Sequence, residues 1–141
     1  MLWNSLCPLV GASNWTWGIA GRMSRDVPPD PERAGGEQRQ HSLGLRASGP
    51  MPASLRLDLG LRLIRLADDE GYSPLLENNA RRRIDQAQLS IELSRPLSVF
   101  GGSAGNGSDW ILQLQRARQS SNLVIFRYEG ASVFTGFRTR W

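Results

Sequence analysis

The sequence predicts an all-β fold of antiparallel, up-and-down transmembrane strands, about six in number, that form an incomplete β-barrel. Apolar residues recur at every second position in several segments, as they do on one face of a strand. Turn-forming residues are spread through the chain, with Gly 15 and Pro 8. The connections between candidate strands alternate between long and short, which indicates a series of hairpins with two unlike ends.

The clearest strand is predicted at residues 54–65, where leucines alternate with polar residues or glycine. One face would carry Leu55, Leu57, Leu59, Leu61 and Leu63, and the other Arg56, Asp58, Gly60 and Arg62. A helix would scatter these leucines around its circumference, because its period is about 3.6 residues. We therefore expect one apolar and one polar face.

Five further segments show the same alternation, and residues 1–12 form a poorly defined N-terminal segment. The other candidate strands are residues 13–24, 39–48, 84–99, 110–118 and 131–141, so that the barrel segment covers residues 13–141. In the last of them, one face carries Val133, Thr135, Phe137, Thr139 and Trp141, and the other Gly136, Arg138 and Arg140. These lengths are close to the roughly 9–11 residues with which a tilted strand crosses a bilayer.

The connections are predicted from their polar and turn-forming residues. Residues 25–38, 66–83 and 119–130 are long, and residues 49–53 and 101–109 are shorter. In an up-and-down order the three long connections fall on one side and the two shorter ones on the other. Long loops outside and short turns on the periplasmic side are typical of bacterial outer-membrane barrels.

Composition gives weaker constraints. All 17 basic residues are arginine, and the net charge is +4, which favours anionic partners in general. Cys7 is the single cysteine, so the chain can form no internal disulfide and no cysteine-based zinc site. No run of 18 apolar residues occurs. Residues 1–20 lack the basic start and continuous apolar core of an export signal, so we expect a truncated or mis-started reading frame.

The chemistry of the two faces favours a membrane barrel over a soluble sheet. The apolar faces carry Leu, Ile, Val, Phe and Trp, as expected against lipid, and tryptophans lie near strand ends. The polar faces carry charge and glycine, as expected in a wet lumen. The residues that we expect to face the lumen are Arg56, Asp58, Arg62, Arg138 and Arg140.

The end of the chain resembles a known group of barrels. Residues 110–141 carry an Arg-rich strand, a Ser-Asn pair, an aromatic-x-aromatic pair and a final Gly-x-Arg-x-Arg-Trp. This pattern, about a quarter of the chain, resembles the closing hairpin of barrel domains that follow periplasmic tetratricopeptide repeats. Surface-lipoprotein assembly modifiers and exopolysaccharide-export porins are examples. The resemblance implies a location in the bacterial outer membrane and a signal for the barrel-assembly machinery at Val133, Phe137 and Trp141.

Other features that draw attention have plainer explanations. His41 is the only histidine, and no nucleophile-elbow spacing accompanies it. Asp68, Asp69 and Glu70 could bind calcium but fit a solvated loop better. Residues 101–107 lack the Gly-Lys-Ser/Thr of a phosphate loop. Residues 81–83 are three arginines that could contact lipopolysaccharide. We therefore predict no enzyme, catalytic residue, cofactor or metal.

Three functions stay open at this point. The first is a partial outer-membrane barrel, part of a pore or export channel, in contact with outer-membrane lipid and lipopolysaccharide. Because the smallest single-chain barrels have eight strands, it would need the missing strands of a longer chain or a homo-oligomer. The second is a small soluble Arg-rich β-protein that binds nucleic acid, although Arg138 and Arg140 lie opposite the aromatic residues that would stack on bases. Nucleic acid is therefore not expected. The third is a truncated or pseudogene product without a specific function.

Overall fold

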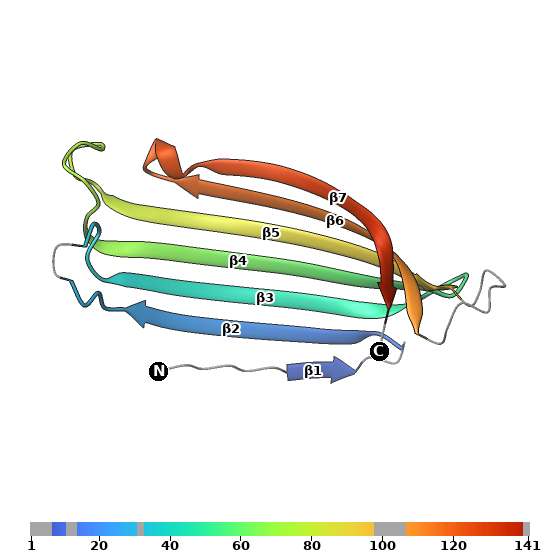
Figure 1. Cartoon of the computed structure of the whole chain (residues 1–141). Coiled ribbons are helices and arrows are strands. Elements are labelled where there is room, and N and C mark those ends of the chain that lie inside the picture. Colours follow the sequence, from blue (N-terminus) through green and yellow to red (C-terminus); the bar gives the residue numbers. More distant parts are fainter. Residues whose placement is uncertain (1–6, 11–13, 31–32, 98–106, 140–141) are drawn as a thin grey trace.

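The computed structural model describes residues 7–10, 14–30, 33–97 and 107–139. In this part, seven antiparallel strands form one sheet, and each strand lies beside its neighbours in the sequence. Figure 1 shows a single curved layer in which β7 bends over in front of the neighbouring strands. The predicted all-β, up-and-down fold is confirmed, and the described strands form an open sheet.

Six of the strands are long. The strands are β1 (Cys7–Val10), β2 (Thr16–Asp26), β3 (Gln38–Met51), β4 (Leu55–Gly71), β5 (Arg81–Pro96), β6 (Ser108–Ser121) and β7 (Tyr128–Thr139), with a 3-10 helix η2 (Val124–Phe126) before β7. The long strands have 11 to 17 residues, and β1 has 4. β1 pairs with β2 and lies in the segment for which the sequence predicted no element.

Several strands continue into segments that the sequence assigned to loops. β4 extends to Gly71, β5 begins at Arg81, and β6 and β7 both reach into residues 119–130. The ladder between β4 and β5 is regular as far as Ala67 and then shifts by a bulge before Gly71. A run of charged residues predicts a solvent-exposed loop. Here Asp68 of β4 and Arg82 of β5 bond to each other across the two strands, so the strand pairing continues.

The connections gather at the two ends of the sheet. We call the end with residues 27–37, 72–80 and 122–127 the loop end, and the other the turn end. The turn between β3 and β4 is short, and Ala53 and Ser54 there have positive φ values of 63° and 59°. Residues 97–107, between β5 and β6, are as many as residues 27–37. The predicted contrast in loop length therefore fails for this connection.

The strand register separates two faces. Leu45, Leu61 and Leu89 pair in a row on one, which we call the apolar face. Ser48, Asp58, Glu92 and Gln113 pair on the other, the polar face. Parity and register place Arg56, Asp58, Arg62 and Arg138 together on the polar face, as the sequence predicted. Arg140 and Trp141 lie outside the described residues.

The sheet buries very little apolar surface. Among the described residues, the buried hydrophobic side chains are Ala47, Ile111 and Leu123. No second layer of described residues covers either face of the sheet. The hydrogen-bonded ladders hold the layer together, while burial that would stabilise a soluble domain is small.

Trp15 supplies one clear packing contact. Its ring lies over Gly49 of β3, where a methyl group would overlap the ring atoms, and beside the ring of Trp17 at a centroid distance of 6.2 Å. An aromatic ring over a glycine covers backbone that would otherwise be exposed. Gly49 is therefore required by the ring that it accommodates.

We expect Gly49→Ala to lower the free energy of unfolding by about 1–3 kcal/mol, because Trp15 must leave its position. Gly44→Ala is the matched control. A methyl group there meets no atom closer than 3.7 Å, and alanine reduces the freedom of the unfolded chain, so a small gain is expected. Denaturant unfolding of the refolded protein measures both changes. Equal effects at the two positions would contradict this packing.

Candidate functional site

The polar face carries a group of ion pairs near the turn end. The Asp58 carboxylate lies 3.4 Å from Arg46 Nη2 and 3.4 Å from Arg56 Nε, and Arg56 also donates a hydrogen bond of 2.6 Å to Ser48 Oγ. Arg138 of β7 pairs with Glu92 of β5, two strands away. Both carboxylates are largely shielded, with side chains 18% and 19% exposed. These contacts link β3 to β4 and β5 to β7 on one face.

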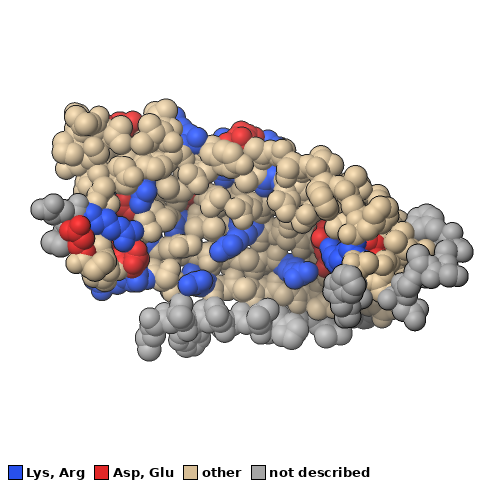
Figure 2. Space-filling view, viewed as in Figure 1, with Lys and Arg blue, Asp and Glu red and all other residues tan. Residues whose placement is uncertain are grey.

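Towards the loop end, the same face has arginines without acidic partners. Arg22 of β2 and Arg62 of β4 make no ion pair with any described residue. In the face turned to the viewer in Figure 2, arginines are spread over the middle of the sheet, and acidic groups lie mainly towards its ends. The polar face is therefore charge-balanced near the turn end and positive along its middle.

A second cluster closes the loop end. Arg82 of β5 makes two hydrogen bonds to the carboxylate of Asp68, of 2.9 and 3.1 Å. The guanidinium carbon lies 4.6 Å from the centre of the Tyr72 ring and 5.0 Å from that of Phe126, and the two rings meet edge to face. The Asp68 side chain is 1% exposed and that of Arg82 15%. The ion pair of Asp68 and Arg82 joins β4 to β5, and the cation–π contact of Arg82 with Phe126 adds η2.

The connection before β3, residues 27–37, packs against this cluster. Gly35 has a positive φ of 84°, and a side chain there would overlap the Asp68 carboxylate. Asp69 accepts a hydrogen bond of 2.8 Å from the backbone N–H of Glu37. The hydrogen bond from Arg25 lowers the pKa of the Glu37 carboxyl below its usual value, and the charges of Arg25 and Arg39 act in the same direction, while desolvation opposes them.

The apolar face is exposed over most of its area. Its aliphatic and aromatic side chains follow one another across β2 to β7. Those more than one-third exposed include Trp17, Ile19, Leu43, Leu45, Leu63, Leu89, Leu114, Val133 and Phe137. On β4 the run from Leu55 to Leu63 is about 27 Å long at about 3.4 Å per residue. We call this continuous surface the apolar band.

The loop-end boundary of the apolar band slopes across the strands. The register aligns Met23 of β2 with Ser120 of β6, yet the band begins only at Leu114, six residues farther from the loop end. On β7 it begins at Ala131, about four residues beyond the same row. Measured from β2, the boundary therefore shifts by about 1.5 residues per strand as far as β6 and by about 0.8 as far as β7, with an equal offset of two residues on β3, β4 and β5.

The remaining candidate residues from the sequence are His41 and the acidic residues 68–70. His41 lies on the apolar face of β3, opposite Arg65. The solvated loop preferred for Asp68, Asp69 and Glu70 is wrong for Asp68, which lies in β4, is shielded from solvent and is bonded to Arg82, while Asp69 accepts a hydrogen bond from the Glu37 backbone N–H. Among the described residues, no group of three or more His, Cys, Asp or Glu side chains is placed to hold a metal. None of the described helices is long and apolar enough to cross a membrane.

Sequence reasoning missed the cluster around Arg82. Residues 81–83 were considered as three equivalent arginines, but Arg82 is largely shielded while Arg81 and Arg83 are exposed. The strand alternation through this segment would have separated them. A scan against protein-family models finds no match for the chain, and comparisons with curated proteins and with solved structures find none either.

Proposed function

We propose that the chain forms part of the wall of an outer-membrane β-barrel, in a pore or export channel that performs no covalent chemistry. The exposed apolar band carries this proposal. Soluble monomers rarely expose continuous apolar patches larger than a few hundred Å². A band across six strands, with no second layer of described residues over it, fits the acyl chains of a bilayer.

The slope of the band supports a membrane over a protein partner. Strands in outer-membrane barrels tilt by about 35–45°. With strands about 4.8 Å apart and residues about 3.4 Å apart, a boundary parallel to the membrane must shift by about 1.0–1.4 residues per strand. The observed average shifts, about 1.5 residues per strand from β2 to β6 and about 0.8 from β2 to β7, lie on either side of this range. At such a tilt, the band on β4 has a height of about 20 Å, close to the usual 25 Å.

The polar face would then line the pore. Its ion pairs near the turn end fix neighbouring strands, while Arg22 and Arg62 are available to solutes. Fixed positive charge in a pore attracts anions and repels cations. The proposal therefore includes a preference for anionic solutes.

The described strands leave two open edges, so a closed barrel requires more strands. They would come from a longer chain or from further copies of this one, since unpaired backbone in lipid costs several kcal/mol per group. Lipid and the barrel-assembly machinery are the proposed partners. Val133 and Phe137, two residues of the proposed assembly signal, lie on the apolar face and are each 71% exposed.

We expect the chain, refolded into phospholipid vesicles, to show a β-type circular dichroism spectrum and, where further copies of the chain complete the barrel, a gel mobility that changes on boiling. Heat-dependent mobility results from a closed hydrogen-bonded barrel that resists the detergent until it is boiled. In planar bilayers, such a barrel should conduct chloride better than potassium, and Arg22→Glu with Arg62→Glu should reverse this preference. A soluble species that does not associate with vesicles would contradict the proposal.

A further inference from the structure

Arginines follow the loop-end boundary of the apolar band. On the apolar face, this arginine belt consists of Arg25, Arg39, Arg65, Arg83, Arg116 and Arg118. They come from β2 to β6, so the belt crosses five strands. A charged side chain at the edge of an apolar surface can reach polar surroundings while its stem stays on the apolar residues.

The acidic side chains that pair with the belt are fewer than its arginines. Glu37 pairs with both Arg25 and Arg39, Asp85 with Arg65, and Glu129 with Arg116. Arg83 and Arg118 are exposed and make no ion pair with a described residue. The belt therefore offers at least two guanidinium groups to an external anion.

The opposite boundary of the band has a different composition. Near the turn end, the apolar face carries Trp15, Trp17, Trp110 and Phe137. Aromatic residues suit a membrane interface of either charge, because they are amphipathic rings. Arginine instead selects for phosphate, to which it can donate two parallel hydrogen bonds. The two boundaries therefore fit two different lipid surfaces.

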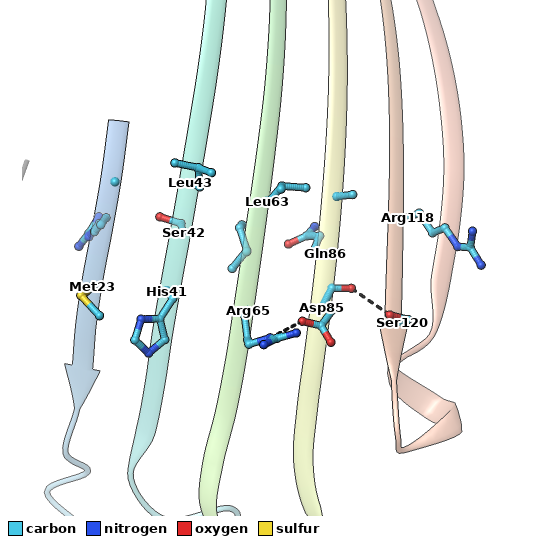
Figure 3. A pocket seen from close by; sticks show the side chains of 14 residues that line it. Met23, His41, Ser42, Leu43, Leu63, Arg65, Asp85, Gln86, Arg118 and Ser120 are labelled. Carbon is cyan, nitrogen blue, oxygen red and sulfur yellow. Dashed lines mark hydrogen bonds and ion pairs between the residues drawn. The ribbon is translucent and has the colours of Figure 1, made fainter. Parts of the chain in front are cut away.

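The surface beside the belt contains a hollow that spans the change from polar to apolar. It is lined by His41, Arg65, Asp85 and Arg118, together with Leu43 and Leu63 of the band. Figure 3 shows His41, Arg65 and Asp85 next to one another on adjacent strands, with Arg118 extending from the strand beyond them. Arg65 donates a hydrogen bond of 2.7 Å to Asp85. Arg118 makes no ion pair with a described residue, although Glu129 lies opposite it in the register and its charge reaches Arg118. Arg22, from the polar face of β2, also contributes to the lining.

From this arrangement we infer that the arginine belt binds the phosphate groups of anionic lipid headgroups, with Arg83 and Arg118 as the principal contacts. The inference rests on the proposed membrane function and adds a lipid class to it. The headgroup phosphate lies at the belt, and the acyl chains of the same lipid lie on the leucines of the band. The loop end thereby faces the more anionic leaflet.

Vesicle flotation tests this inference with the full chain. Binding is compared between phosphatidylcholine vesicles and vesicles in which part of that lipid is replaced by phosphatidylglycerol. We expect tighter binding to the anionic vesicles. The double variant Arg83→Gln/Arg118→Gln should lose about fivefold of this preference per arginine, roughly 25-fold in all, with binding to phosphatidylcholine unchanged. Arg22→Gln/Arg62→Gln removes the same charge from the polar face and should keep the preference.

The outcomes separate the inference from the function on which it rests. Failure to bind either kind of vesicle contradicts the barrel proposal itself. Equal binding to both vesicles, or equal loss in the two double variants, overturns the arginine belt alone. Inorganic phosphate is the third arm. We expect it to weaken the preference more strongly than chloride of the same ionic strength, because it competes for the same guanidinium groups. An effect no larger than that of chloride would mean that the belt responds to charge alone and does not recognise phosphate.

Discussion

Leu89→Arg is expected to lower the free energy of unfolding in a bilayer by about 1–3 kcal/mol, because an arginine that faces lipid costs about 2–4 kcal/mol at the middle of a barrel wall and about 0–1 kcal/mol near its edges. Leu89 lies on β5 within the apolar band, between Leu61 of β4 and Arg116 of β6 in the register. Its side chain is 45% exposed in the sheet alone. In water the same substitution on an exposed strand position should change stability by less than about 0.5 kcal/mol.

Gln86→Arg is the matched control on the same strand. Gln86 lies on the polar face between Ile64 and Gln119, so the new guanidinium adds no charge next to another. We expect little change for it in the bilayer, because a wet lumen accepts arginine. Urea titration of vesicle-refolded protein measures both variants. Similar small effects for the two would mean that the apolar face does not contact lipid.

Asp68→Ala is expected to destabilise the protein by about 3–5 kcal/mol, because it leaves the positive charge of Arg82 in a largely buried place without its carboxylate. The contacts of Arg82 with Tyr72 and Phe126 compensate only part of this loss. The loop end should open, so limited proteolysis of residues 72–80 should accelerate together with the fall in the denaturation midpoint.

The control for this substitution is Asp85→Ala. Asp85 also pairs with an arginine, but the side chains of Arg65 and Asp85 are 74% and 55% exposed. An exposed pair contributes about 0–1 kcal/mol, so this variant should stay close to the wild type. Replacing both Asp68 and Arg82 by leucine should recover much of the lost stability, since no buried charge then remains. An Asp68→Ala variant as stable as Asp85→Ala would contradict the burial of the pair.

The strands were predictable because the alternation of apolar and polar residues can be recognised in the sequence without knowledge of tertiary contacts. Five alternating leucines in residues 54–65 can share a face only in a strand, and β4 has them on one face. The polar face was predictable for the same reason, and so was the shared face of Arg56, Asp58, Arg62 and Arg138. The separation of faces depends on parity alone, and parity can be read from the sequence.

The contacts across strands were not predictable in this way. Glu92 and Arg138 are 46 residues apart, and their pairing depends on the register of three strands. The Arg82 cluster joins Tyr72 and Phe126 from separate connections. The strand extensions at residues 66–71 and 81–83 were missed because their charged residues resemble a loop until the pair between Asp68 and Arg82 is known. β1 has only 4 residues, too few for a periodic signal.

The central claim is that one face of the sheet contacts lipid and the other contacts water. A spin-label scan along β5 tests it directly. Single cysteines, in a Cys7→Ser background, are placed in turn at consecutive positions of the refolded protein. The positions are Gln86, Ala87, Gln88, Leu89, Ser90 and Ile91.

We predict that collision with oxygen, which concentrates in lipid, is high at Ala87, Leu89 and Ile91. Collision with a water-soluble nickel chelate should be high at Gln86, Gln88 and Ser90. This alternation would place the apolar face in the bilayer and the polar face in an aqueous lumen. High access of the nickel chelate at both sets of positions would contradict the account, because both faces of the sheet would then lie in water.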